Sequence, residues 1–310
     1  MIYTCTVAPS IDCTNYLADF KIGELNRSEK VYYYPGGKGI NVSRVLKRHG
    51  VDSVALGFAG GFTGRFIEDF LAEENVKTDF IGTGQISRIN IKIKSGDETE
   101  LNGPGPELTK AHLEELKEKV KNIRSGDWFV LSGSIPEELP LAYFAALAET
   151  CQNAGARFVL DTSGKALKEL IKSKPFLIKP NKEELGDLFQ TEIKGIEQAA
   201  EYAFELTKQG VENVIVSMGA EGAILVDKEQ ALFARAPRGK MVNTVGAGDS
   251  MVSGFIAALS QGRSKADAFR YSIASGSATA FRADLCTKED TEKLLDQIEV
   301  QPIKRLDVSK

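Results

Sequence analysis

The sequence has 310 residues, of which 42% are hydrophobic and 26% charged, and its formal net charge is −4. This composition is typical of a globular protein, and the charge argues against a broad nucleic-acid-binding surface. Four scattered cysteines and two histidines predict neither disulfide bonds nor a structural zinc site. Without a secretory leader or a membrane-spanning run, we expect a cytoplasmic protein.

The first hundred residues contain two segments with the pattern of half-exposed strands. Residues 8–34 have few helix signals and end in a tyrosine-rich run, and in residues 88–101 isoleucines alternate with polar residues. A period of two is typical of strands whose two faces differ. We expect the segments to form a small sheet, a lid over the larger part of the protein. Because exposed sheets often pair with a second copy, we expect a homodimer through this lid.

The rest of the chain alternates short apolar runs with amphipathic segments. The pattern predicts an α/β fold, a doubly wound and mostly parallel sheet flanked by helices, as a single domain over residues 1–310. The predicted strands cover residues 128–131, 157–161, 176–179 and 214–217. The predicted helices cover residues 139–151, 165–172, about 182 onward, 196–209, 250–259, 265–281 and 288–298.

Ligands of open parallel sheets bind beyond the carboxyl ends of the strands. Ser132, Asp161, Lys179 and Ser217 fall at such positions. Each alone is an ordinary strand-end residue, but four on one rim favour a binding site. The chain lacks the GxxxxGK[ST] loop and a GxGxxG after a strand, which removes the main support for P-loop and Rossmann nucleotide sites.

The segment from Asn243 to Ser250 is the most informative part of the sequence. Gly246, Ala247 and Gly248 are small, so backbone N–H groups at the start of the following helix are able to surround an anion. Phosphoryl transfer needs such an anion site, and Asp249 beside it is a candidate base for the accepting hydroxyl. The alternative is that Asp249 only caps the helix.

A second glycine-rich segment precedes a helix that we expect to begin near Asn41. Gly37 and Gly39 allow close approach of the backbone to a ligand, Lys38 adds a positive charge, and Asn41 adds a donor and an acceptor. These features suit an anionic ligand rich in hydroxyls. The alternative is a plain glycine turn before a helix.

Further candidates each have a structural alternative. Asn181 and Glu184 are three residues apart and suit Mg²⁺, or they form an N-cap with an acidic first turn. Arg88 is a phosphate clamp on the lid or a solvated side chain, and Asp12 is a ligand of sugar hydroxyls or a turn residue. We expect the two histidines, His49 at a helix end and His112 on a charged helix, to take no part in catalysis.

Together these segments resemble the PfkB, ribokinase-like family of carbohydrate kinases over nearly the whole chain. Residues 36–41 (GGKGIN) are similar to the N-terminal signature of that family, and residues 245–250 (VGAGDS) to its C-terminal signature. Within the family the segments 87–92, 133–136 and 179–181 are most similar to the 1-phosphofructokinases, with tagatose-6-phosphate kinases second. One departure is Ala8, where the family usually has Asn.

The resemblance implies an ATP- and Mg²⁺-dependent enzyme with a small β-sheet lid that also forms a dimer. It implies Asp249 as the base, with Gly246, Ala247 and Gly248 as the anion hole. It assigns sugar-phosphate binding to Asp12, Gly37, Lys38, Gly39, Asn41 and Arg88, ATP binding to Lys179, Asn181, Ser217, Gly219 and Gly222, and Mg²⁺ to Asn181 and Glu184. A monovalent cation near residues 243–245 is a further candidate.

The resemblance favours phosphorylation of fructose 1-phosphate at its 6-hydroxyl. The alternatives are a tagatose-6-phosphate kinase, a kinase for another sugar or a nucleoside, and a sugar-phosphate sensor without turnover. A pure sensor needs no base, which argues against it because Asp249 is present.

Overall fold

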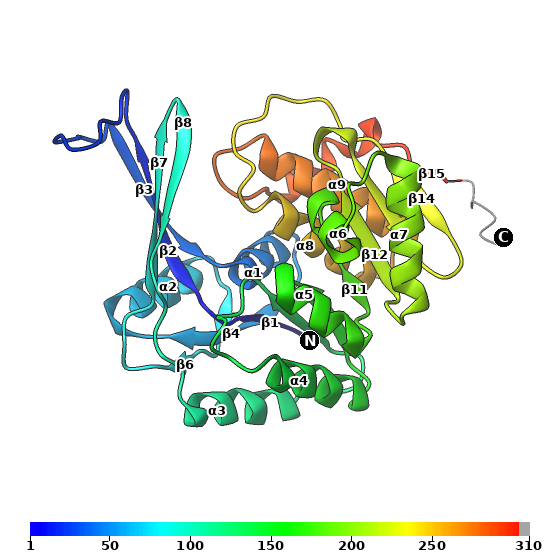
Figure 1. The fold of residues 1–310 in the computed structure, drawn as a ribbon, viewed down its shortest axis with the longest axis horizontal. Helices are drawn as coiled ribbons and strands as arrows, with labels where there is room; N and C mark the ends of the chain where they lie inside the picture. Colours follow the sequence, from blue (N-terminus) through cyan, green and yellow to red (C-terminus); the bar gives the residue numbers. More distant parts are fainter. Residues whose placement is uncertain (304–310) are drawn as a thin grey trace.

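Residues 1–303 are described by the computed structural model, and they form a large sheet covered by helices and a small projecting sheet (Figure 1). Within these residues the large sheet has eleven strands in the order β15-β14-β13-β12-β11-β10-β9-β1-β4-β5, with β6 paired to β4. The strands are β1 Ile2–Thr6, β4 Ser53–Ala59, β5 Lys77–Thr78, β6 Ile81–Gly82, β9 Trp128–Ser132, β10 Arg157–Asp161, β11 Leu177–Ile178, β12 Asn213–Ser217, β13 Ala223–Val226, β14 Ala231–Ala234 and β15 Gln301–Pro302.

The strands from β12 to β5 pair in parallel, and β13, β14 and β15 extend one edge in antiparallel pairs. The predicted α/β class is therefore confirmed, with an antiparallel edge added. Proceeding along the chain, strands are added first on one side of β1 and then, from β9, on the other. That reversal creates a crevice at the carboxyl ends of β1 and β9, where open α/β sheets bind their ligands.

Helices cover both faces of the large sheet because its strands are apolar on both sides. Phe129 and Leu131 pack with α3 to α7, whereas Trp128 and Val130 pack with α1, α8 and α9 on the opposite face. The helices are α1 Lys38–Arg48, α2 Gly61–Glu73, α3 Lys110–Lys121, α4 Leu141–Asn153, α5 Gly164–Leu170, α6 Lys182–Phe189, α7 Ile196–Lys208, α8 Ala247–Ser260, α9 Lys265–Ala280 and α10 Lys288–Glu292.

The small sheet is the predicted lid, and it projects from the body beside α1 and α2 (Figure 1). Its order is β3-β2-β7-β8, with β2 parallel to β7 and the other pairs antiparallel. The strands are β2 Ser10–Tyr16, β3 Lys30–Gly36, β7 Arg88–Ser95 and β8 Asp97–Asn102. Residues 8–34 and 88–101 thus supply the lid, as the alternating pattern indicates.

The two helices at the signature segments begin earlier than predicted. α1 begins at Lys38 rather than near Asn41, and α8 begins at Ala247 rather than at Ser250. The N-cap residues Gly37 and Gly246 have φ of 118° and 79°, a region that favours glycine. The chain therefore turns into each helix within the glycine-rich segment itself.

His49 ends α1, as expected, but its side chain is buried in a polar cluster under α9. The Tyr271 hydroxyl lies 3.0 Å from its Nδ1, and the Ser275 Oγ lies 3.3 Å from its Nε2. His112 instead accepts a hydrogen bond from the Thr109 amide in the capping box of α3. Both histidines have structural partners away from the crevice.

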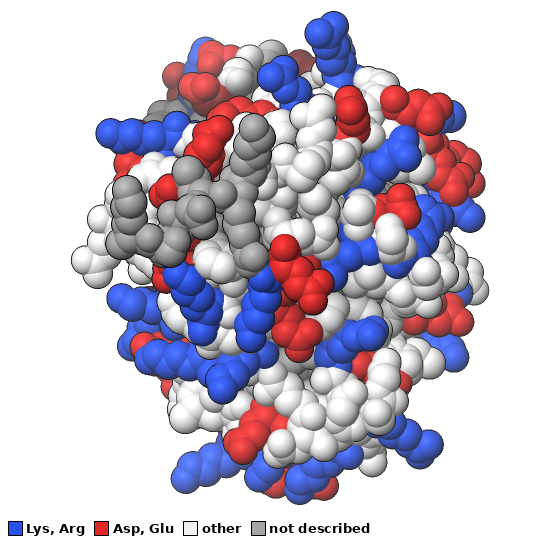
Figure 2. All heavy atoms as spheres, turned by 90° about the vertical axis from the view of Figure 1, so that its right-hand side faces the viewer, with Lys and Arg blue, Asp and Glu red and all other residues white. Residues whose placement is uncertain are grey.

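Charges are mixed over the side of the molecule where α7, β14 and β15 lie. Figure 2 shows basic and acidic side chains interspersed among uncharged ones over the described part of this face. This side of the molecule therefore has no extended surface of a single charge sign among the described residues. Among residues 1–303, no helix has the length and apolarity needed to cross a membrane.

The buried His49 generates a prediction about stability and pH. Burial, together with Lys288 and Arg263, lowers the pKa of His49 from 6.5 to about 4. Between pH 6.5 and pH 4 the His49 side chain is protonated in the unfolded chain but stays neutral in the folded protein. The free energy of unfolding therefore has its full value above pH 6.5 and decreases as the pH falls towards 4. We expect this group to lower the free energy of unfolding by roughly 2 kcal/mol between pH 7.5 and pH 5.

Urea unfolding of wild type and His49→Gln at several pH values measures this contribution. Parallel pH dependences of the two proteins would contradict it.

Candidate active site

A cleft lies at the crevice where β1, β9 and β10 end and the lid begins. It brings together residues from both signature segments, from the lid and from the strand ends. The residues that line it are Thr6, Ala8, Ser10, Asp12, Gly37, Lys38, Asn41, Arg88, Asn90, Gly133, Ser134, Ser163, Lys179, Val245, Gly246, Gly248 and Asp249. Two segments some 200 residues apart in sequence thus share one cavity.

Asp249 lies in the first turn of α8, and its carboxylate is almost completely buried. The N-cap of α8 is Gly246, so Asp249 is not the residue that caps this helix. The side-chain amide of Asn41 donates to Asp249 Oδ2 at 2.8 Å. Burial first and the nearby Asp161 second raise the pKa of Asp249 to about 6, against the opposing effects of Lys38, Asn41 and Lys179. Such a carboxylate is a stronger base than an exposed one and is still ionised at neutral pH.

The backbone around Gly246 and Gly248 leaves no room for side chains. A Cβ at Gly246 would lie 2.4 Å from Leu285, and a Cβ at Gly248 would lie 3.0 Å from the Lys179 Nζ. The ammonium group of Lys179 is therefore beside the N-terminal turn of α8. A helix N-terminus with an adjacent lysine suits a phosphate group.

The lid contributes Asp12 and Arg88 to the cleft. Asp12 Oδ1 accepts hydrogen bonds from Ser10 Oγ at 2.8 Å and from Asn90 Nδ2 at 3.0 Å. Arg88 is half-buried, burial lowers its pKa although Asp12 opposes this, and its Nε has no hydrogen-bond partner among the described residues. A carboxylate fixed from behind and an arginine with an unused donor are suited to hydroxyls and to a phosphate, respectively.

Lys38 begins α1 and points towards the end of β10. Its Nζ is 3.8 Å from Asp161 Oδ1, and the Lys179 Nζ is 3.6 Å from the same oxygen. The pKa of Lys38 is raised, chiefly by Asp161, with Asp249 and Glu184 contributing. The lysine therefore stays charged in spite of its burial.

A second hollow lies beside α6 and contains part of the predicted nucleotide site. Asn181, Ser217 and Gly219 line it. Asn181 Oδ1 accepts from the Glu184 amide at 2.7 Å, and Glu184 Oε2 accepts from the Asn181 amide at 2.8 Å. These two residues therefore form a capping box, the alternative to a Mg²⁺ site that the sequence analysis left open. The second carboxylate oxygen of Glu184, Oε1, takes no part in the capping box.

Four of the predicted residues, Gly39, Gly222, Ala247 and Glu184, do not line either hollow. A Cβ at Gly39 would lie 2.6 Å from Thr6 Oγ1, and a Cβ at Gly222 would lie 2.1 Å from the Ala234 carbonyl. These glycines permit close packing of α1 on β1 and of residue 222 on β14. Ala247 is the first residue of α8, and only its neighbours Gly246 and Gly248 line the cleft. Lys179 lines the cleft with Asp249, whereas Asn181, two residues later, lines the other hollow.

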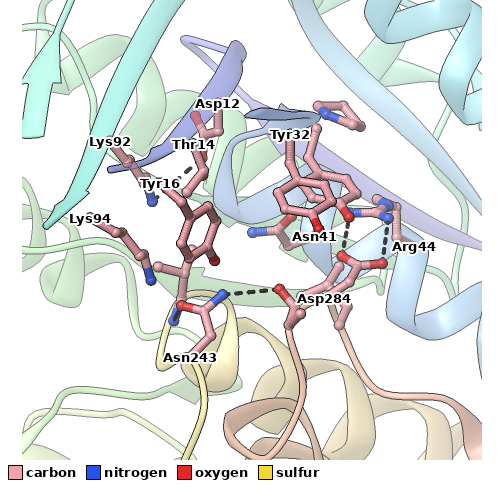
Figure 3. Close-up of a pocket in the computed structure, with 15 residues that line it drawn as sticks. Asp12, Thr14, Tyr16, Tyr32, Asn41, Arg44, Lys92, Lys94, Asn243 and Asp284 are labelled. Carbon is pink, nitrogen blue, oxygen red and sulfur yellow. Dashed lines mark hydrogen bonds and ion pairs between the residues drawn. The ribbon is translucent and has the colours of Figure 1, made fainter. Parts of the chain in front are cut away.

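A side chamber adjoins the cleft between the lid and the loops around α8 and α9 (Figure 3). Lys92 and Lys94 of β7 enter it from the lid, opposite Asn243 and Asp284. Arg44 of α1 closes it, and its guanidinium pairs with Asp284 Oδ2 at 3.1 Å and with Glu74 at 2.8 Å. This buried pairing fixes the loop that follows α9 against α1.

The sequence gives a partial signal for the cleft residues that were not predicted. Ser10 and Asn90 lie in the alternating lid strands on the same face as Asp12 and Arg88, so strand periodicity is able to identify them. Asp161 is predicted as a strand-end residue on the binding rim, but nothing in the sequence pairs it with two lysines. Ser134 lies in the segment 133–136 that carries part of the family resemblance, whereas Ser163 follows a strand end and carries no distinguishing pattern.

Comparisons with known proteins agree with this geometry. The sequence matches the pfkB family of carbohydrate kinases over residues 5–292. It is 50% identical over 300 residues to 1-phosphofructokinase of Bacillus subtilis, covering 97% of this chain and 99% of that protein. It is 38% identical over 301 residues to D-tagatose-1-phosphate kinase of Bacillus licheniformis, covering 97% and 99%.

A solved structure of a relative has the same fold. The crystal structure of phosphofructokinase-2 from Escherichia coli in complex with substrates and products matches with a TM-score of 0.91 at 33% identity, covering 95% of this chain and 98% of that one. The same Escherichia coli protein has also been solved in complex with potassium and in a tetrameric inhibited form. The family match and the 50% identity over nearly the whole length show that this chain belongs to the pfkB family of carbohydrate kinases.

Proposed function

We propose that this protein transfers the γ-phosphoryl group of ATP to the 6-hydroxyl of fructose 1-phosphate, giving fructose 1,6-bisphosphate and ADP. The observation that carries the proposal is the buried Asp249 beside the glycine-flanked start of α8, in a cleft that also contains Arg88 and Lys38. The 50% identity to 1-phosphofructokinase of Bacillus subtilis supports the substrate.

In this proposal each part of the cleft acts on one part of the reaction. Asp249 accepts the proton of the attacking hydroxyl, and the N–H groups at Gly246 and Gly248 stabilise the charge on the transferred group. Asp12 and Asn41 orient sugar hydroxyls, while Arg88 binds the phosphate that is already on the sugar. Lys38 and Lys179 add positive charge on either side of the phosphoryl group.

The nucleotide then occupies the hollow beside α6, with its phosphates directed towards Asp249. Ser217 and Gly219 line that hollow, and Lys179 stands between it and the cleft. Glu184 Oε1 and Asn181 fit a water-mediated contact to Mg²⁺, which neutralises phosphate charge when bound. We also place a monovalent cation near residues 243–245, supported by the potassium complex of the Escherichia coli relative.

A second candidate substrate is a tagatose phosphate. Its support is the 38% identity over nearly the full length to D-tagatose-1-phosphate kinase of Bacillus licheniformis. Tagatose and fructose differ in one stereocentre, so the same base and phosphate contacts serve both sugars. A cytoplasmic enzyme agrees with both substrates.

We further propose a homodimer through the lid. On one face of the lid, Tyr33, Cys13, Ile91 and Leu101 form a row across the four strands, and Tyr33 and Leu101 are more than half exposed. The opposite face carries Asp12 and the other polar residues of the cleft. An exposed apolar row on a sheet is a pairing surface.

ADP release with Mg-ATP and a panel of sugars tests the function. The panel contains fructose 1-phosphate, fructose 6-phosphate, tagatose 1-phosphate, tagatose 6-phosphate and free fructose. We expect fructose 1-phosphate to be preferred, and Asp249→Asn to lower kcat on the order of 10²- to 10⁴-fold because the base is lost. Preference for a tagatose phosphate would support the second candidate, and near-normal turnover by Asp249→Asn would refute the assigned base.

Arg88→Ala tests the phosphate contact. We expect KM for fructose 1-phosphate to rise roughly 10- to 100-fold, because a charge-assisted contact is removed, while KM for ATP stays unchanged. Arg124→Ala, an exposed arginine in the turn before β9, is the control and leaves both KM values unchanged. An unaltered KM for the sugar phosphate in Arg88→Ala would instead favour an unphosphorylated substrate.

Light scattering after size-exclusion chromatography tests the dimer. The chain mass is 33.7 kDa, and we expect wild type to show twice this mass. A charge at the apolar row, Tyr33→Asp, favours the monomer because it must be desolvated on pairing. Lys172→Asp, on the exposed turn after α5, is the control. A monomeric wild type would refute this part of the proposal.

A further inference from the structure

Asp161 is a buried carboxylate to which the proposed reaction assigns no task. It ends β10, between β9 and β11, and is 2% exposed. Its Oδ1 lies within 4 Å of two ammonium groups, those of Lys38 and Lys179. Its Oδ2 is buried and has no hydrogen-bond partner among the described residues. A buried carboxylate is costly unless cations balance it, so these two lysines are its compensation.

The two lysines come from different elements that line the cleft. Lys38 begins α1, beside the loop at Gly133, on the side where Asp12 and Asn41 lie. Lys179 follows β11 and lies against Gly248 at the start of α8. Among the described residues, Asp161 is therefore the side chain that is ion-paired to both Lys38 and Lys179.

We propose that Asp161 is a positioning residue for phosphoryl transfer, whose carboxylate holds the ammonium groups of Lys38 and Lys179 on the two sides of the transferred group. The proposal rests on the proposed function, since it deepens the account of that site. It assigns Asp161 no contact with the sugar or with the reacting hydroxyl.

The geometry of these ion pairs positions the two ammonium groups without using up their hydrogen-bond donors. Distances of 3.6 and 3.8 Å are ion-pair distances but are longer than hydrogen bonds, so the ammonium donors stay available. With Asp249 the cluster contains two carboxylates and two ammonium groups, and its charges balance. When a phosphoryl group enters, both lysines are able to pair with its negative charge with little rearrangement. Electrostatic preorganisation requires such an arrangement.

Asp161 also acts on the proposed base through its charge. The charged and polar groups that face Asp249 are Asp161 from β10, Lys38 and Asn41 from α1, and Lys179 after β11. Of these, only Asp161 raises the pKa of Asp249, while the other three lower it. Removing the charge of Asp161 therefore makes Asp249 a weaker base that stays ionised to lower pH.

The test compares Asp161→Asn with wild type in steady-state turnover between pH 5 and pH 9. Asn keeps the size of the side chain and removes its charge. Asp227→Asn is the matched control, because Asp227 is 3% exposed and paired with Lys265, yet follows the antiparallel strand β13 and so lies at the opposite rim of the sheet. All variants are compared at equal folded fraction by thermal unfolding.

We expect kcat of Asp161→Asn to fall about 10- to 100-fold, because the lysines lose their common anchor, with a KM for sugar phosphate within about threefold of wild type. The acidic limb of its kcat/KM profile, which reports the free enzyme and lies near pH 6 in wild type, moves to lower pH. Asp227→Asn changes neither. A kcat within threefold of wild type and an unmoved acidic limb would overturn the proposal.

A double-mutant cycle separates positioning from a general structural role. Because Asp161 acts through the lysines, its removal costs less in a Lys38→Met background than in wild type. Fully additive losses in kcat would contradict the proposal. If Asp161→Asn does not fold, Asp161→Glu is used, which retains the charge and should keep the acidic limb in place while lowering kcat.

One measurement needs no turnover and so separates this proposal from the proposed function. After reductive methylation with ¹³C-formaldehyde, the dimethyl-lysine signal of Lys38 is assigned by its loss in Lys38→Arg. Since Asp161 is the main cause of the raised pKa of Lys38, this signal should titrate at lower pH in Asp161→Asn. An unchanged titration would refute the pairing. If wild type phosphorylates none of the sugars, the proposed function fails while this result still stands.

Discussion

The hydrogen bond from Asn41 to Asp249 joins two segments that are 208 residues apart, and the geometry of the cleft depends on it. Each residue lies in the first turns of a helix that starts at a glycine N-cap, so both helices begin at the same cavity. The Ser253 hydroxyl, which donates to the Val42 carbonyl at 3.3 Å, continues the contact between α1 and α8. Because both helix starts are held together, the proposed anion-binding N–H groups, the proposed base Asp249 and the Asn41 amide that is hydrogen-bonded to it form one unit.

The lid adds a polar face to that unit because alternate residues of its strands point to the same side of the sheet. Asp12, Thr14 and Tyr16 of β2 share a face with Arg88, Asn90 and Lys92 of β7, because the two strands pair in register from Ser10 with Arg88 onward. That face looks into the cleft and the side chamber of Figure 3, whereas Ile91 and Tyr33 point the other way. In the function and the dimer that we propose, one pleated sheet thus presents sugar-binding residues on one face and the pairing surface on the other, since each strand directs alternate residues to each face.

The sequence predicts the fold well, for physical reasons that differ between elements, and the structure brings most of its candidate site residues together in one cleft. Apolar runs such as 128–131 are buried on both faces, which specifies the parallel sheet, and the period of two over residues 88–101 specifies the lid. The helix starts were predicted too late because the glycines at 37 and 246 serve as N-caps, which composition alone does not reveal. Gly39 and Gly222 were predicted to bind ligands, but close backbone packing explains them. The pairing of Asp161 with two lysines depends on the strand order, which a local pattern does not encode.

The burial of Asp249 explains why such a site contains balanced charges rather than a positive field alone. A cleft with only Lys38, Lys179 and Arg88 would bind phosphates tightly but would lower the pKa of the carboxylate and weaken it as a base. Burial and Asp161 act in the opposite direction and bring that pKa to about 6, which leaves the group ionised at neutral pH yet more basic than an exposed aspartate. The same two lysines are then able to serve the transferred phosphoryl group, because their charge is already offset before it arrives. In the mechanism that we propose, the second carboxylate, Asp161, thus reconciles two demands that conflict in a purely cationic site, namely anion binding and proton abstraction.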